Sequence, residues 1–398
     1  MDNLCELLRK KVLERLDFPK ELEEIELKEL IGRELAATQE VITLSLSQRR
    51  LIEQRVFNSL RKLDILQELI EDDEVTEILV NGPKHIFYEK KGEFWEYPYH
   101  FSSEEKLQDV IQQIVGRHNR VVNLSSPIVD THLEDGSRVN VVLAPVSIDG
   151  SAISIRKFSR TPLDMDTLIR KGTITQEAAD FLKMLVRSRY NLFISGGTSS
   201  GKTTFLNALS AFIPKGERII TIEDSAELQL QDVPNMVRLE TRNANIEGMK
   251  PIKARELIHT AVRMRPDRII VGECRGDEAL DMLQAMNTGH DGSLSTGHAN
   301  STKDMLSRLE TMVLMGTELP LLAVRQQIVS GLDVLIHLER SADKLRRVVE
   351  IAEIAGLEQG EIVLNRLYYD ENGLKKKGDL LHRQKLELSG EEVVQCEE

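Results

Sequence analysis

This chain of 398 residues contains few cysteines, few aromatic residues and no long apolar run. Its three cysteines, Cys5, Cys274 and Cys396, lie far apart and form no CxxC pair, which argues against a disulfide framework and a zinc site and fits a reducing compartment. Aromatic residues make up only 4% of the chain, so a groove of stacked aromatic side chains for single-stranded nucleic acid is not expected.

No apolar stretch approaches the length of a membrane span, and the first 16 residues alternate charge with leucine, unlike a signal peptide. The net charge of −13 leaves no broad cationic face for a nucleic-acid backbone, so no stable nucleic-acid partner is expected. A local basic patch remains compatible with this charge. These features predict a cytoplasmic protein whose association with a membrane goes through a partner protein or through its own surface.

Residues 196–204 match the phosphate-loop pattern G-x-x-x-x-G-K-[ST]. An apolar run at 191–195 predicts a buried strand before the loop, and 204–212 predicts a helix after it. In that context backbone N–H groups surround a polyphosphate, Lys202 reaches the β- and γ-phosphates, and the Thr203 hydroxyl binds Mg²⁺. ATP and Mg²⁺ are therefore the predicted cofactors. The predicted nucleotide-binding residues are Gly196, Gly197, Thr198, Ser199, Ser200, Gly201, Lys202, Thr203 and Thr204.

The length and the changes in hydrophobic period predict an α/β protein of several domains. Leucines at helical spacing open the chain, a period of two begins near Val75, and strands alternate with helices around the phosphate loop. The predicted parts are a helical bundle (1–70), a small α/β domain (71–158), a linker (159–172), a RecA-like P-loop ATPase domain (173–356) and a C-terminal extension with an acidic tail (357–398).

Acidic residues follow two predicted strands after the loop. Glu223, Asp224 and Glu227 come at the end of the run 217–223, where an acid can orient or deprotonate a water molecule or cap the next helix. The run 268–273 resembles a Walker B strand, with Gly272 where many P-loop enzymes have aspartate. Glu273 is then predicted to hold the hydration shell of Mg²⁺ or to polarise water.

Two histidines, His290 and His298, flank a short predicted strand bounded by glycines. A zinc site would need two further ligands nearby, and none is present. Hydrogen bonding to the γ-phosphate is the better interpretation. In the small domain, Arg138 and Arg156 each lie on a predicted strand, either as exposed strand residues or as guanidinium groups directed at an anion.

Together these sequence motifs resemble those of the type II/type IV secretion-system ATPases, hexameric motors of protein export and pilus assembly. The resemblance covers about residues 74–355 and includes the phosphate loop, the acid box 221–227, the atypical Walker B run 270–273 and the His box 288–298, in that order. The helical leader and the runs 135–140 and 149–158 are similar to the CpaF/TadA branch, which powers Tad (Flp) pili. The chain has no tetracysteine zinc motif, unlike the type II secretion and pilus-extension branch.

The resemblance implies a role for each candidate residue. Glu227 would be the general base, Glu273 the Walker B acid, and His298 a neighbour of the γ-phosphate. Arg138 and Arg156 would reach the phosphates from the small domain, so that hydrolysis depends on domain closure. It also implies a homohexamer that acts on an inner-membrane platform protein. Two alternatives remain from the residues themselves, a RecA-like nucleic-acid motor and a non-catalytic scaffold controlled by ATP binding.

Overall fold

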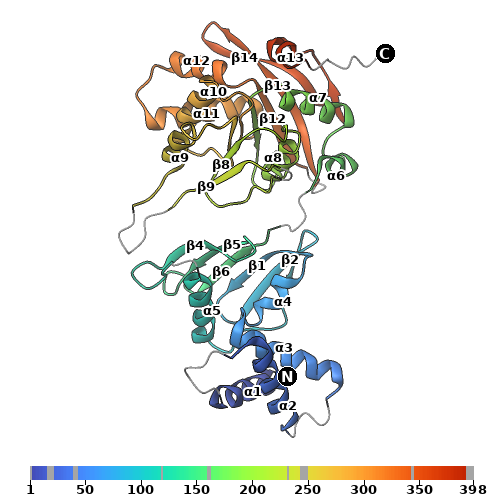
Figure 1. The fold of residues 1–398 in the computed structure, drawn as a ribbon, viewed down its shortest axis with the longest axis vertical. Helices are drawn as coiled ribbons and strands as arrows, with labels where there is room; N and C mark the ends of the chain where they lie inside the picture. The colour runs from blue at the N-terminus through green and yellow to red at the C-terminus, as the bar shows by residue number, and fades with distance from the viewer. Residues whose placement is uncertain are drawn as a thin grey trace. The chain divides into compact units, whose positions relative to one another are not determined.

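The computed structural model describes residues 2–15, 22–38, 44–117, 120–158, 163–230, 233–242, 250–341 and 345–390. The chain divides into two compact units, Met1–Arg160 and Thr161–Glu398 (Figure 1). The predicted acidic tail from residue 391 onwards lies outside the described residues. Within the described ranges, no helix combines the length and the apolar character that crossing a membrane requires.

The first unit contains two hydrophobic cores. The helices α1, α2 and α3 enclose one core, with Leu8, Ile31 and Ile52 fully buried. The second core lies between α4, α5 and one face of a six-stranded antiparallel sheet of order β3-β2-β1-β6-β5-β4. The elements of the first unit are α1 (Asp2–Arg15), α2 (Glu24–Ala36), α3 (Leu46–Arg61), α4 (Leu66–Glu71), β1 (Val75–Asn81), β2 (His85–Lys90), β3 (Glu93–Glu96), α5 (Glu104–Gly116), β4 (Ile128–His132), β5 (Arg138–Val142) and β6 (Ala152–Arg156).

The second unit is a nine-stranded sheet of order β15-β14-β13-β12-β7-β11-β10-β8-β9, covered by helices on both faces. The six neighbouring strands β12, β7, β11, β10, β8 and β9 run parallel to one another, and β13, β14 and β15 extend the sheet with antiparallel pairs. Its strands are β7 (Leu192–Gly196), β8 (Ile219–Glu223), β9 (Met236–Glu240), β10 (Arg268–Val271), β11 (Leu294–Gly297), β12 (Val334–Arg340), β13 (Arg346–Glu358), β14 (Glu361–Asp370) and β15 (Leu374–Lys376). Its helices are α6 (Met165–Arg170), α7 (Gln176–Arg187), α8 (Lys202–Ser210), α9 (Ala254–Ala261), α10 (Glu278–Asn287), α11 (Thr302–Gly316), α12 (Leu321–Gly331) and α13 (Gln384–Ser389).

The α/β fold predicted from the sequence is confirmed, with differences at two predicted boundaries. The sheet does not end at residue 356, because β13 continues to Glu358 and pairs with β14 along most of its length. Residues 357–376 are thus part of the sheet and not a separate extension. Within the predicted linker, residues 165–170 form α6, because Met165 and Leu168 are buried in the core below α7 and α8.

The sheet order determines where the functional residues meet. Strands β7, β11, β10 and β8 are consecutive parallel neighbours, so their carboxyl ends lie at one edge of the sheet. The phosphate loop follows β7, His298 follows β11, Glu273 follows β10, and the acid box ends β8. In open α/β sheets this edge is the usual place of ligand binding.

Candidate active site

The phosphate loop is a tight turn between β7 and α8. Ser199 and Gly201 both have positive φ, +59° and +94°. A Cβ atom on Gly196 would collide with the Leu338 carbonyl oxygen and lie 2.6 Å from the Ser200 hydroxyl oxygen. The glycines at 196 and 201 are thus required by space and by backbone conformation. The turn presents the first residues of α8 to the site, as binding of phosphate at a helix N-terminus requires.

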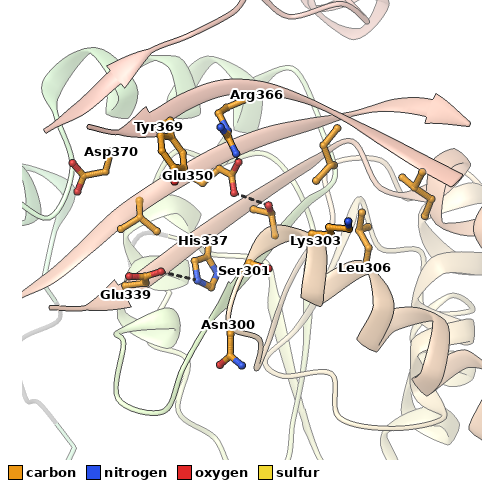
Figure 2. Close-up of a pocket in the computed structure, with 14 residues that line it drawn as sticks. Asn300, Ser301, Lys303, Leu306, His337, Glu339, Glu350, Arg366, Tyr369 and Asp370 are labelled. Atoms are coloured by element: carbon orange, nitrogen blue, oxygen red, sulfur yellow. Dashed lines mark hydrogen bonds and ion pairs between the residues drawn. The ribbon is translucent and has the colours of Figure 1, made fainter. Parts of the chain in front are cut away.

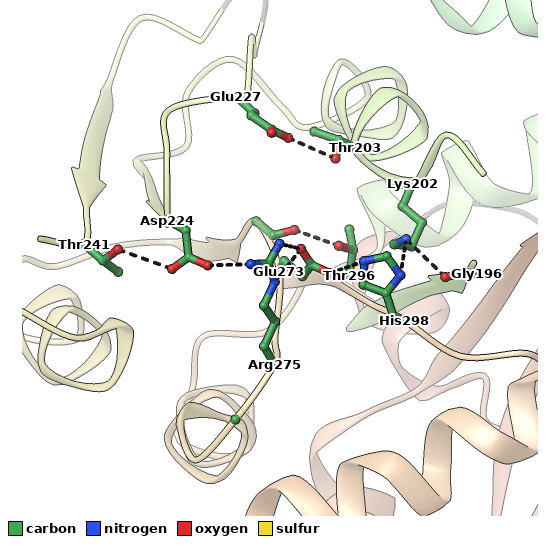
Figure 3. A network of polar contacts seen from close by, with 12 residues as sticks. Gly196, Lys202, Thr203, Asp224, Glu227, Thr241, Glu273, Arg275, Thr296 and His298 are labelled. Carbon is green, nitrogen blue, oxygen red and sulfur yellow. Dashed lines mark hydrogen bonds and ion pairs between the residues drawn. The ribbon is translucent and has the colours of Figure 1, made fainter. Parts of the chain in front are cut away.

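Lys202 is buried, 8% exposed, and its ammonium group lies inside the loop. It donates hydrogen bonds to the carbonyl oxygens of Gly196 at 3.1 Å and Gly197 at 2.9 Å, and to His298 Nδ1 at 3.3 Å (Figure 3). Ser200 Oγ is buried and has no hydrogen-bond partner among the described residues. A buried donor without a protein partner at this position fits a phosphate oxygen.

Glu227 lies opposite the first turn of α8. Its Oε2 atom is 3.5 Å from the Thr203 hydroxyl oxygen, which brings together two of the residues predicted to serve hydrolysis (Figure 3). The backbone around Glu227 is held by Glu223, whose Oε2 accepts hydrogen bonds from the N–H groups of Glu227 at 2.7 Å and Leu228 at 2.6 Å. Glu223 therefore fixes the loop that carries the candidate base.

Glu223 is itself almost completely buried, 4% exposed, and burial raises the pKa of its carboxyl group. Its Oε1 accepts a hydrogen bond from the Thr221 hydroxyl at 3.3 Å. A Cβ atom on Gly272 would lie 3.2 Å from Glu223 Cγ, closer than ordinary van der Waals contact. The glycine in the Walker B position is thus explained by space, because a larger residue would press on the carboxylate that holds the acid box.

Glu273 connects the phosphate loop to the acid box. One oxygen lies 2.8 Å from His298 Nε2, and the other accepts a hydrogen bond from Arg275 Nε at 2.8 Å (Figure 3). The Arg275 guanidinium also lies 3.4 Å from Asp224 Oδ2. Burial, followed by the nearby Lys202 charge, lowers the pKa of His298, so the imidazole is neutral at neutral pH.

The structure brings together all the candidate residues of the second unit: the loop residues with Lys202 and Thr203, Glu227, Glu273 and His298. Thr198 is exposed, and Thr204 is half-buried in the first turn of α8. Arg138 and Arg156 belong to the other unit. They are direct cross-strand partners on β5 and β6, so both lie on strands, as predicted. Arg138 is half-buried and Arg156 is exposed.

Sequence reasoning missed three residues at this site. The sequence marks Glu223 only as one acid of a cluster, whereas in the structure it is buried beside Gly272 and accepts a hydrogen bond from the Leu228 N–H group. Arg275 follows the Walker B acid by two residues, a spacing that could have indicated it. Arg346 donates a hydrogen bond from Nε to the Ser199 carbonyl oxygen at 2.9 Å, and no local signal marks it.

A cavity of about 840 Å³ lies over β12, β13 and β14, on the other side of β7 from the strands that precede Glu227 and Glu273 (Figure 2). One of its walls contacts the strand before the phosphate loop, because His337 Nδ1 lies 2.8 Å from the hydroxyl oxygen of Ser195 on β7. Burial lowers the pKa of His337. Thr302 and Arg366 both hydrogen-bond the carboxylate of Glu350 on the cavity wall, at 2.6 and 2.7 Å.

The donor groups fit Mg²⁺ bound together with a nucleotide. The Thr203 hydroxyl, and the Glu273 carboxylate through water, offer the oxygen groups that Mg²⁺ prefers. Among the described residues, no three His, Cys, Asp or Glu side chains gather into a group that could hold a metal ion. Mg²⁺ here would thus depend on phosphate oxygens, as is common for this ion.

Comparison with known proteins finds a match to the family described as "Type II/IV secretion system protein" over residues 59–372. A protein of Mycobacterium tuberculosis that is named for conjugal transfer is 32% identical, over 80% of this chain and 91% of its own length. The type IV secretion system protein PtlH of Bordetella pertussis is also 32% identical, over 73% of this chain and 93% of its own.

Among solved structures, the ATPase DotB of Legionella pneumophila has a similar fold. Its TM-score is 0.54 at 22% identity, and the alignment covers 73% of this chain and 79% of DotB. The likeness supports the α/β fold described above.

Proposed function

Since the chain belongs to the type II/IV secretion system protein family, whose members are secretion ATPases, we propose that it is an ATP-hydrolysing motor of pilus assembly or secretion. One observation carries the proposal. Lys202, His298 and Glu273 form a connected network at the phosphate loop, and Glu227 faces Thr203 across the same site (Figure 3). A loop that only bound phosphate would not need two acids and a histidine at this edge.

Each residue has a distinct task in the proposed reaction. Lys202 leaves the loop carbonyl oxygens and binds the β- and γ-phosphates, since a phosphate oxygen is a stronger acceptor for an ammonium group. Glu227 accepts a proton from the attacking water. His298 lies beside the γ-phosphate and connects two of its neighbours, because its Nδ1 accepts from Lys202 and its Nε2–H faces the Glu273 carboxylate. Mg²⁺, held by Thr203 and through water by Glu273, would supply neutralisation of the phosphate charge.

Arg138 and Arg156 are proposed to complete the site from the small domain. The register makes Arg138 and Arg156 direct cross-strand partners on β5 and β6, so the small domain carries two positive charges on neighbouring strands. A polyphosphate is an anion that such charges attract, and positive charge delivered by a moving domain would make hydrolysis depend on closure. We propose further that the protein acts as a homohexamer of the CpaF/TadA type at the cytoplasmic face of the membrane, on a platform protein.

The proposal is tested by Glu227→Gln in the full chain. We expect nucleotide binding to stay within about twofold while turnover falls by at least a hundredfold, the range of an acid-base contribution. Asp224→Asn is the matched control, because it removes a neighbouring charge that faces Arg275 and not Thr203. Wild-type turnover by the Glu227 variant would refute the assigned base, and no turnover by the wild-type protein would refute the motor.

The arginines are tested separately, with Arg156→Ala against Lys84→Ala, which removes one exposed positive charge of the same unit. Turnover and mass by light scattering are measured over a range of protein concentrations. We expect activity to rise as a hexamer forms and the Arg156 variant to bind ATP without turning it over. A monomer that hydrolyses ATP fully without Arg156 would contradict the ring and the role of the arginines.

A further inference from the structure

The hairpin of β12 and β13 brings Arg346 to the phosphate loop from 147 residues further along the chain. Arg346 Nε donates to the Ser199 carbonyl oxygen at 2.9 Å, and its Cδ lies 3.1 Å from the place that a Cβ on Gly201 would occupy. Both loop residues have positive φ. The side chain of Arg346 therefore lies directly against the turn that surrounds the phosphates.

Side-chain alternation places Arg346 on the face of the sheet that carries α8. Leu338 and Val348 pack in the core beneath α8, and Arg340 and Arg346 follow that face two residues further along each strand. The register sets Arg340 directly opposite Arg346, and both residues are exposed. The register thus brings two positive charges to the end of the hairpin that contacts the phosphate loop.

The order of the strands indicates which part of a nucleotide would meet this hairpin. The acids and His298 come from β8, β10 and β11, all on one side of β7, whereas β12 and β13 lie on its other side. In the proposed function, Lys202, Glu273 and His298, which contact one another, lie at the γ-phosphate end of the site. A nucleotide that lies along the loop with that orientation has its α-phosphate and ribose on the side of the hairpin.

We propose that Arg346 is a nucleotide-binding residue that contacts the α-phosphate of a nucleoside di- or triphosphate, and that Arg340 adds positive potential there. The inference rests on the proposed function, because it needs a nucleotide in the phosphate loop. The contact is made by ATP and ADP alike. It therefore contributes to affinity and leaves the transfer of the γ-phosphate to the residues on the other side of β7.

The experiment measures the affinity of the full chain for a fluorescent ADP and for a non-hydrolysable ATP analogue, together with kcat at saturating ATP. For Arg346→Ala we expect both dissociation constants to rise by about tenfold or more, as loss of a charge-assisted hydrogen bond predicts, with kcat within about twofold. Arg347→Ala is the matched control. Its side chain hydrogen-bonds Ser341 Oγ at 3.0 Å and alternates to the other face of the sheet, so its affinities should equal those of the wild type.

Arg346→Gln separates contact with the nucleotide from bracing of the loop, because glutamine can still donate to the Ser199 carbonyl oxygen but has no charge. We expect it to bind as weakly as Arg346→Ala. Wild-type affinity in the glutamine variant, unchanged ADP affinity in the alanine variant, or a loss confined to the ATP analogue would each overturn the proposal. Wild-type protein that binds neither nucleotide would instead overturn the proposed function.

Discussion

Replacing Glu223 by alanine should displace the candidate base, Glu227, without removing any residue that is proposed to contact the nucleotide. The substitution leaves two N–H groups, those of Glu227 and Leu228, without their acceptor. An orphaned buried donor costs about 1–3 kcal/mol. Part of this loss is offset because a buried carboxyl group with a raised pKa is no longer present. We therefore expect a net loss of about 2 kcal/mol in the free energy of unfolding of the second unit.

The effect on turnover should exceed the effect on stability. Without its anchor the acid-box loop shifts, and a displacement of about 1 Å at a catalytic group can reduce the rate by about a hundredfold. Nucleotide affinity should change little, because Glu223 accepts hydrogen bonds from Thr221, Glu227 and Leu228, which all lie outside the phosphate loop. The assay compares kcat, the ADP dissociation constant and urea denaturation for wild type and variant.

Glu223→Gln is the matched control for this prediction. Its amide oxygen can accept both N–H groups, and its amide nitrogen can donate to the Thr221 hydroxyl in place of the present hydrogen bond. We expect kcat within a few-fold of wild type. If the glutamine variant were as slow as the alanine variant, the carboxylate itself would take part in catalysis and the anchoring role would be refuted. Wild-type kcat in the alanine variant would refute it as well.

Three further outcomes follow from the packing around the same sheet. Gly272→Ala should lower the free energy of unfolding by about 1 kcal/mol and reduce kcat, since the new Cβ would lie 3.2 Å from Glu223 Cγ. Gly216→Ala is the control, because its Cβ meets nothing within 4 Å, and it should leave kcat unchanged. Equal kcat for the two variants would contradict the prediction. Arg268→Ala should lower the free energy of unfolding by about 3 kcal/mol. Arg268 is fully buried, and its loss removes the buried partner of Glu217, which keeps its ion pair with Arg189, and the donor to the Val186 and Gly292 carbonyl oxygens. A loss below about 1 kcal/mol would show that water replaces the guanidinium. Burial raises the pKa of Glu223 in the folded state, so the wild type loses stability as the pH rises from the usual glutamate range through the raised pKa. Glutamine does not titrate, so the melting temperature of Glu223→Gln minus that of the wild type should increase over this pH range. A difference that is independent of pH would contradict the raised pKa.

Local features of the site were predictable from the sequence because they depend on neighbouring residues. The glycines, Lys202 and Thr203 between an apolar run and a helix determine a phosphate loop wherever such a strand is buried. The strands that end at Glu223 and before Glu273 were predicted from their apolar runs, and β8 and β10 are buried at every position. Their meeting at one edge followed from the rule that carboxyl ends of neighbouring parallel strands share an edge.

Other features could not be predicted, because they arise from pairing between distant strands. The continuation of the sheet through β14 depends on an antiparallel register with β13, which charged residues along both strands conceal in the sequence. The opposition of Arg138 and Arg156 likewise depends on the register of β5 and β6.

The sequence by itself determined that this protein has a phosphate loop, an α/β fold and acids at the ends of consecutive strands. Only the tertiary structure decided which acid is an anchor and which faces Thr203, because burial is a property of the surroundings and Glu223 and Glu227 are chemically identical. It also decided that Arg346 lies against Ser199. Hydrogen bonds over 147 residues depend on how the strands are ordered, and no local pattern encodes that order.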